Sequence, residues 1–207
     1  MKDVTIQKLE NFIDDSDYME LIEKIINSLE KCKLEDFILN ISKRWEHNET
    51  TEEYRKQLCE MIYPILEENV YDSPIRTIDV KFLRHLKSND EINEGAFSWH
   101  SDNHPPHIIN IIVYLTDVGE NDGGMEYAEV DGSIIKREFS SPAGGKILTQ
   151  EIEQLKNTSD VKVHKMTGQK GTVFIFDNCI FHRASVPIDK DRDALLLQVE
   201  PSTERVI

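Results

Sequence analysis

The segment from His107 to Thr116, HIINIIVYLT, restricts the possible folds more than any other part of this chain. If its backbone is extended, apolar side chains lie on both faces, because successive residues of a strand point to opposite sides. A strand that is apolar on both faces is buried in the middle of a sheet. The chain therefore predicts a β-rich protein in which this segment is a central strand.

Further strand signals follow residue 72 and are separated by turns. Gly119–Gly124 is a cluster of turn residues. Asp131-Gly132 joins two short segments in the way that is typical of a tight hairpin. We expect a short helix near Thr149–Lys156 in an otherwise loop-like stretch. Besides the central strand, the expected strands cover residues 75–86, 96–100, 125–130, 133–139, 161–166, 171–177, 179–186 and 193–200.

Before residue 72 the apolar spacing is helical. One helix is expected after Asp15 or Ser16, either of which can cap it, and a second over Leu34–Trp45. A third begins at 48–51, and Pro64 should bend it or end it early. We therefore expect one α+β, mainly β domain over 1–207. Residues 1–71 form a mainly helical layer on one face, and residues 72–207 form an antiparallel sandwich or barrel.

Charge and cysteine content narrow the classes of partner. The chain of 207 residues has a net charge of −15 and no Lys/Arg-rich stripe, which argues against binding to nucleic acid or to a membrane surface. No apolar stretch is long enough to span a bilayer. The three cysteines are scattered and odd in number, which favours free thiols in the cytosol.

Two histidines and one aspartate have the pattern of a metal site. His100 and Asp102 are separated by one residue at the end of an expected strand, and His182 lies in a late apolar strand. Two histidines and a carboxylate form the facial triad that binds non-haem Fe(II). His104 and His107 would suit a zinc site only on a helix, which Pro105-Pro106 prevents, so we place them at the mouth of a pocket. The alternative is that His182 is a core histidine and that the match is coincidental.

Four segments together resemble the Fe(II)- and 2-oxoglutarate-dependent oxygenases, most closely the prolyl-4-hydroxylase-like and phytanoyl-CoA-dioxygenase-like branch. They are WHSD (99–102), IIVYLTDVGENDGGMEYA (111–128), GTVFIFDNCIFHRA (171–184) and RDALLLQ (192–198). The resemblance implies a double-stranded β-helix (jelly roll) with His100, Asp102 and His182 as iron ligands. It also implies a dioxygenase that uses O₂ and 2-oxoglutarate, with ascorbate as a candidate reductant. Such an enzyme hydroxylates a C–H bond of a peptide (for example prolyl) or small-molecule substrate and releases succinate and CO₂.

The resemblance also implies a binding site for the cosubstrate. Arg192 is the expected partner of the distal carboxylate of 2-oxoglutarate, because a guanidinium binds a carboxylate through two donors. Lys190 is the competing candidate. Relatives often carry a hydroxyl residue where this chain has Ala194, so a second donor must come from elsewhere. Tyr114 is the candidate for that donor, and Asn110 is a candidate donor to the keto-acid end.

Two rival functions remain on the sequence alone. A cupin-like jelly roll could bind a metal or another ligand without oxygenase activity. An interaction module would bind no metal and would use its helices as the interface. The sequence does not determine the oligomeric state, nor whether the substrate is a peptide or a metabolite.

Overall fold

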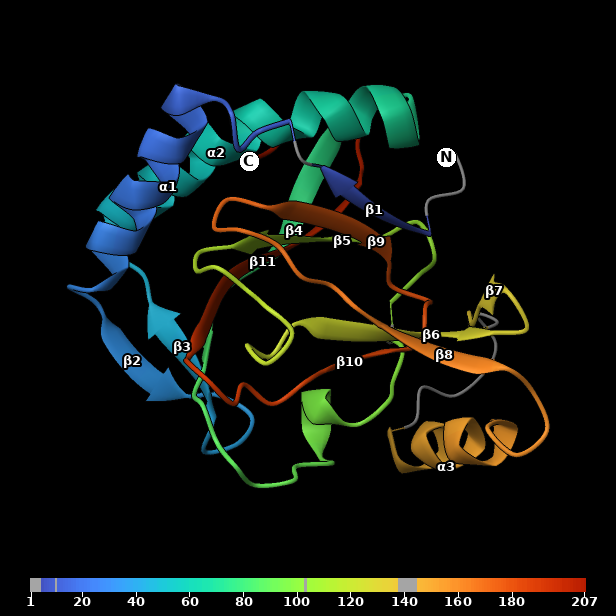
Figure 1. Ribbon diagram of the computed structural model, residues 1–207. Helices are drawn as coiled ribbons and strands as arrows, with labels where there is room; N and C mark the ends of the chain where they lie inside the picture. Colours follow the sequence, from blue (N-terminus) through green and yellow to red (C-terminus); the bar gives the residue numbers. More distant parts are fainter. Residues whose placement is uncertain (1–4, 10, 103, 138–144) are drawn as a thin grey trace.

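The computed structural model describes residues 5–9, 11–102, 104–137 and 145–207 of the chain. Two β-sheets pack face to face, and two helices cover the outer face of the larger sheet (Figure 1). The chain is therefore a β-sandwich with a helical layer on one side. The fold class predicted from the sequence, a mainly β jelly-roll core with N-terminal helices on one face, is confirmed.

The larger sheet has seven strands in the order β1-β9-β5-β11-β4-β3-β2, and all the neighbouring strands run antiparallel. β5 lies in its interior, between β9 and β11, as its apolar character on both faces predicts. The strands are β1 (Ile6–Leu9), β2 (Lys33–Asp36), β3 (Ser42–Glu46), β4 (Ile75–His85), β5 (Ile109–Tyr114), β9 (Val173–Asp177) and β11 (Arg192–Pro201).

The smaller sheet is built around β6 (Met125–Val130). β10 (His182–Ala184) and β7 (Ser133–Ile134) pair with β6, and β8 (Val161–Lys165) pairs with it as well. The predicted hairpin at Asp131-Gly132 joins β6 to β7, and both turn residues have positive φ, 50° and 82°. Such angles are those of the tight turn that matches strand twist.

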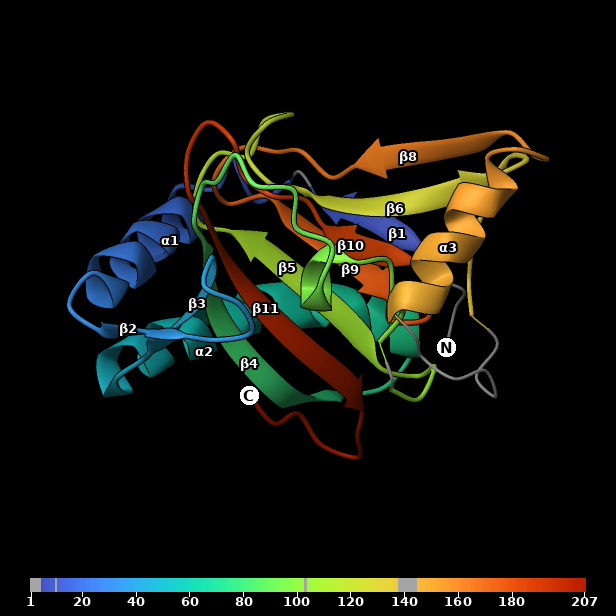
Figure 2. The same ribbon diagram turned by 90° about the horizontal axis from the view of Figure 1, so that it is seen from below.

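The helical layer consists of α1 (Ser16–Leu29) and α2 (Glu49–Leu66), which η1 (Glu67–Tyr71) extends as a π-turn. Asp15 caps α1 by accepting from the backbone N–H groups of residues 17 and 18, and Asn48 caps α2. α2 continues past Pro64, so the expected early end is wrong. η2 (Gly95–Phe97) is one 3₁₀ turn, and α3 (Gly145–Leu155) lies on the far side of the molecule from α1 (Figure 2).

Successive side chains of β5 point to opposite faces of the larger sheet and belong to two different hydrophobic cores. Ile109, Ile111 and Val113 belong to the core shared with α1 and α2, whereas Tyr114 belongs to the core between the sheets. Asn110 and Ile112 share the inner face with Tyr114, since side chains two apart on a strand lie on one side. The helices thus stabilise one face of the large sheet and leave the other to form a cavity with the smaller sheet.

The helix predicted over Leu34–Trp45 is wrong, because this segment is the β2–β3 hairpin. Leu34 and Trp45 are directly opposite across that hairpin, and β3 then pairs with β4. The apolar spacing of three and four residues imitated a helical face. Packing between neighbouring strands stabilises the hairpin in place of a helix. One such contact is between β4 and β3, where the guanidinium of Arg84 lies 4.7 Å from the centre of the Trp45 ring.

Other boundaries differ less. The expected strand at 96–100 is the 3₁₀ turn η2 followed by a single β-bridge from His100, and β1 was not predicted at all. Gly95 has φ of 56°, and a Cβ there would lie 2.7 Å from a side-chain methyl of Ile38, so this close turn favours glycine. The strand expected over 133–139 is limited to β7, and residues 138 and 139 lie outside the described chain. The helix expected near 149–156 is α3.

Candidate active site

His100 and His182 are brought side by side by a short antiparallel bridge between the loop after η2 and the start of β10. Each backbone N–H donates to the carbonyl of the other residue, at 3.0 and 2.9 Å. Residues opposite one another in an antiparallel pair share a face. The centres of the two imidazole rings are consequently 4.3 Å apart.

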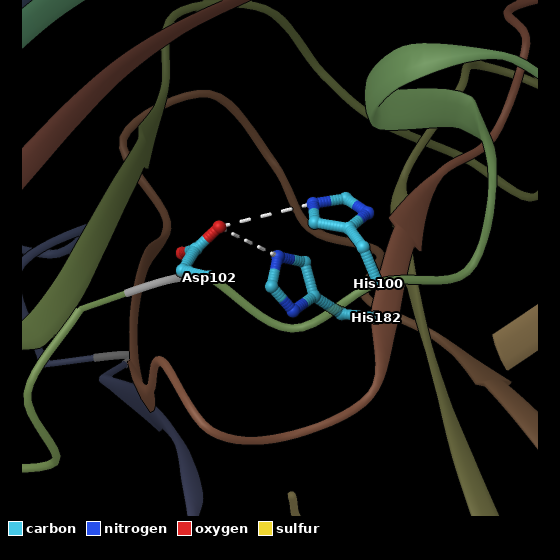
Figure 3. Close-up of side chains that lie close together, drawn as sticks. All are labelled: His100, Asp102 and His182. Atoms are coloured by element: carbon cyan, nitrogen blue, oxygen red, sulfur yellow. Dashed lines mark ion pairs between the residues drawn. The ribbon is translucent and has the colours of Figure 1, made fainter. Parts of the chain in front are cut away.

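Asp102 completes the group from the turn after His100 (Figure 3). Its Oδ1 lies 3.8 Å from Nε2 of His100 and 3.8 Å from Nε2 of His182. Asn178 fixes the backbone on which Asp102 stands: its carbonyl accepts from Asp102, and its buried side-chain amide donates to the carbonyls of Pro105 and Ile108. The structure thus brings together the three residues that the sequence selected.

Hydrogen bonds orient both imidazoles with Nε2 towards the carboxylate. Nδ1 of His100 lies 2.8 Å from the carbonyl of Ser98, and Nδ1 of His182 lies 3.0 Å from the carbonyl of Ile180. A carbonyl only accepts, so each Nδ1 carries a proton, and Nε2 is the nitrogen that is free to bind a metal. Burial, then the neighbouring His182, lowers the pKa of His100 to about 4, so its imidazole is neutral at pH 7.

The carboxylate of Asp102 is held from behind. The side-chain amide of Asn110 donates to its Oδ2 at 2.6 Å, and Gln198 donates to the amide oxygen of Asn110 at 2.9 Å. Arg137 donates to the backbone carbonyl of Asp102 at 2.9 Å. These bonds keep Oδ1 directed at the histidines. Such supporting contacts are typical of residues that bind a metal.

This donor set fits Fe(II). One ligand atom from each of His100, Asp102 and His182 lies within 4.8 Å of the others, and within the described chain no other group of three His, Cys, Asp or Glu side chains meets that criterion. Nitrogen and oxygen ligands at about 2.1 Å from one ion, at right angles, lie about 3 Å apart, so small side-chain rotations suffice. Two imidazoles and one carboxylate are the set that non-haem iron enzymes use.

A cavity of about 260 Å³ lies beside these residues, between the two sheets. The larger sheet contributes lining residues from β3, β4, β5, β9 and β11, and the smaller sheet contributes them from β6 and β10. Its lining includes all three triad residues, Arg192 and Asn110. The remaining lining residues are Phe37, Ile38, Ser42, Lys81, Leu83, His85, Ala96, His104, Ile112, Met125, Phe176, Ala184, Leu196 and Gln198.

Arg192 and Lys190, the two candidates for the carboxylate anchor, lie in different surroundings. Arg192 opens β11 and lines the cavity with only 6% of its surface exposed. Burial lowers its pKa, but a guanidinium remains charged at neutral pH. Lys190 is half-exposed, faces Asp122 at 3.4 Å and is not part of the lining. The geometry therefore favours Arg192 as the candidate.

Tyr114 and Asn110 already have partners within the protein. The hydroxyl of Tyr114 donates to the carbonyl of Met166 at 2.6 Å, and Tyr114 is not a lining residue. Asn110 lines the cavity but supports Asp102. Their contacts with a cosubstrate stay predictions.

Of the two histidines expected at the pocket mouth, His104 lines the cavity, whereas His107 faces Glu200 at 3.4 Å.

Sequence reasoning missed Ser42, His85, Asn178 and Gln198. His85 shows no pattern in the sequence, and Ser42 lay inside the wrongly predicted helix. Gln198 has the same parity as Arg192 on β11, which could have placed it on the inner face. The importance of the other three depends on strand register and loop contacts, which one sequence does not reveal.

Comparison with known family models and with curated proteins finds no match. Several solved structures are similar. The epimerase SnoN, in complex with Fe³⁺, alpha ketoglutarate and nogalamycin RO, matches with a TM-score of 0.69 and 14% identity, covering 97% of this chain and 80% of SnoN. HygX from Streptomyces hygroscopicus, with nickel, 2-oxoglutarate and hygromycin B bound, matches with a TM-score of 0.64 and 16% identity, covering 96% and 84%.

A third match is the non-heme alpha ketoglutarate dependent carbocyclase SnoK, with a TM-score of 0.66 and 14% identity over 99% of this chain and 84% of SnoK. At such identities the matches show a shared fold. The chain has the β-sandwich on which these iron and 2-oxoglutarate proteins are built. No helix in the part of the chain that the structure describes is long and apolar enough to cross a membrane.

Proposed function

We propose that this chain is a non-haem oxygenase that depends on Fe(II) and 2-oxoglutarate. The observation that carries the proposal is the convergence of His100, Asp102 and His182 on the wall of a cavity that also contains the buried Arg192. 2-Oxoglutarate has a keto-acid end, which suits iron held by the triad, and a distal carboxylate, which suits the guanidinium of Arg192. The fold shared with SnoN and HygX, which hold a metal and this keto acid, supports the proposal.

The residues that line the cavity have distinct roles in the proposed reaction. When bound, iron and 2-oxoglutarate would supply the oxidant from O₂. His100, Asp102 and His182 hold the iron, while Asn110 keeps the carboxylate of Asp102 in place. Arg192 binds the distal carboxylate, which orients the keto acid. The carboxylate ligand favours hydroxylation, because a halogenase of this superfamily gives up that ligand to admit halide.

We propose hydroxylation of a C–H bond of a peptide or small molecule, with release of succinate and CO₂ and with ascorbate as a reductant. The motifs around His100 and His182 support the prolyl-4-hydroxylase-like and phytanoyl-CoA-dioxygenase-like branch. SnoN is an epimerase and SnoK a carbocyclase, so the same fold serves other outcomes. The reaction product must therefore be identified directly.

The net charge of the chain supports a class of substrate, and its free thiols support a cellular compartment. A net charge of −15 favours a cationic or peptide substrate through electrostatic attraction and disfavours nucleic acid. Cys32, Cys59 and Cys179 are all free, which supports the reducing cytosol as its compartment.

The activity can be tested by supplying Fe(II), O₂, ascorbate and 2-oxoglutarate together with peptide and metabolite pools. We expect succinate to form and one component of a pool to gain the mass of one oxygen atom. His182→Ala should abolish both signals. His107→Ala is the matched control, because this histidine lies outside the cavity lining. Succinate formation that survives in His182→Ala would contradict the assigned triad.

A further inference from the structure

One row of side chains crosses three neighbouring strands at the buried end of the cavity. His85 on β4 is directly opposite both Ser42 on β3 and Arg192 on β11. Residues opposite one another in an antiparallel sheet point to the same face. All three line the cavity, with exposed fractions of 1% for Ser42, 3% for His85 and 6% for Arg192.

Two polar atoms of this row have no hydrogen-bond partner among the described residues. They are the hydroxyl oxygen of Ser42 and Nε of Arg192, and both are buried. Leaving a buried donor without a partner is unfavourable, so such atoms in a native protein call for an explanation. A hydroxyl and a guanidinium N–H both donate to a carboxylate. One carboxylate bound between them would satisfy both.

His85 holds the guanidinium so that Nε remains available. Its Nδ1 lies 2.6 Å from one terminal nitrogen of Arg192, and the other terminal nitrogen donates to the carbonyl of Gly123. Arginine only donates, so Nδ1 of His85 is unprotonated. Burial, then the charge of Arg192, keeps the pKa of His85 well below 6.5. The ring of Phe97, 5.0 Å from that of His85, packs against the imidazole.

We propose that Ser42 is the second donor to the distal carboxylate of 2-oxoglutarate and that His85 is a positioning residue for Arg192. This assignment rests on the proposed function. It also accounts for Ala194, which has no hydroxyl to offer from β11. Ser42 replaces that hydroxyl from β3, two strands away, so the N-terminal β2–β3 hairpin becomes part of the cosubstrate site.

The test compares two keto acids on the Fe(II)-loaded protein without O₂. 2-Oxoglutarate has the distal carboxylate, and 2-oxobutyrate lacks it. Ser42→Ala should raise the Kd for 2-oxoglutarate about ten- to a hundredfold, the usual effect of a hydrogen bond to a charged group, and leave the Kd for 2-oxobutyrate unchanged. Ser42→Thr keeps the hydroxyl and should keep the affinity. Ser28→Ala is the control, because Ser28 is a buried serine of α1.

His85 is tested in the same titration. His85→Phe keeps an aromatic ring but removes the acceptor, and should weaken 2-oxoglutarate selectively. His85→Asn restores an acceptor near Nδ1 and should recover part of the affinity. Unchanged 2-oxoglutarate binding in Ser42→Ala, or an equal loss of both keto acids, overturns the assignment of Ser42. A wild-type protein that binds iron but neither keto acid contradicts the proposed function itself.

Discussion

Asn110 offers a sharp test of how the metal centre is supported. Its amide donates to Oδ2 of Asp102 at 2.6 Å and accepts from Gln198, and only 1% of its surface is exposed. Asn110→Leu removes the hydrogen bond that keeps the carboxylate of Asp102 directed at the histidines, and loss of such a supporting contact should lower metal affinity about ten- to a hundredfold. At 1.36 kcal/mol for each factor of ten, this is about 1.4–2.7 kcal/mol of binding free energy.

Calorimetric titration with Mn(II), which suits carboxylate ligands and resists oxidation in air, measures this effect. Ile112→Val is the control, since Ile112 lies on the same face of β5 and lines the same cavity. Thermal melting of the metal-free variants verifies that they fold. Metal affinity within twofold of wild type in Asn110→Leu, with weaker 2-oxoglutarate binding, would show that Asn110 serves the cosubstrate and not Asp102.

Three further outcomes follow from the same geometry. Arg192→Ala should weaken 2-oxoglutarate binding more than tenfold while Lys190→Ala leaves it unchanged, and the reverse result in a titration would exchange their roles. Gly123→Ala should destabilise the protein by about 1–3 kcal/mol in urea unfolding, because Gly123 has φ of 77° and a Cβ would lie 2.5 Å from Pro187; wild-type stability would contradict this. Below pH 6.5 the unfolded state protonates at His85 and the folded state does not, so acid should lower the unfolding free energy by up to about 1.4 kcal/mol per pH unit for this group. His100, whose pKa is also lowered, adds its own share, so His85→Asn should make the slope shallower by about 1.4 kcal/mol per pH unit, and an unchanged slope would contradict this.

The sequence predicted those parts of the molecule that depend on local pattern. The apolar character of His107–Thr116 on both faces correctly placed β5 inside the sheet. The spacing of His100 and Asp102, with His182 in a later strand, selected the three residues that the structure brings together. The resemblance to the oxygenases, with the apolar strand that follows, selected Arg192, which opens the last strand and lines the cavity.

The features that the sequence did not predict depend on pairing between segments that are distant in the chain. The residues from Leu34 to Trp45 have helical spacing, yet their pairing with β4 makes them a hairpin. That error hid Ser42, whose place in the cavity depends on the register of β3. His85 was overlooked for the same reason, because only its alignment with Arg192 gives it a partner. For Tyr114 the sequence predicted a hydroxyl that donates to the cosubstrate. In the structure this hydroxyl donates to the carbonyl of Met166, a contact between distant segments that the sequence does not reveal.

The central claim is that this cavity binds iron and 2-oxoglutarate together. The most direct measurement is an anaerobic titration of the Fe(II)-loaded protein with 2-oxoglutarate, followed by visible absorption. We expect the weak charge-transfer band that arises when a keto acid chelates triad-bound iron. The band should be lost in His182→Ala and weakened in Arg192→Ala. Metal binding without any band would contradict the account and favour a cupin-like jelly roll without oxygenase activity.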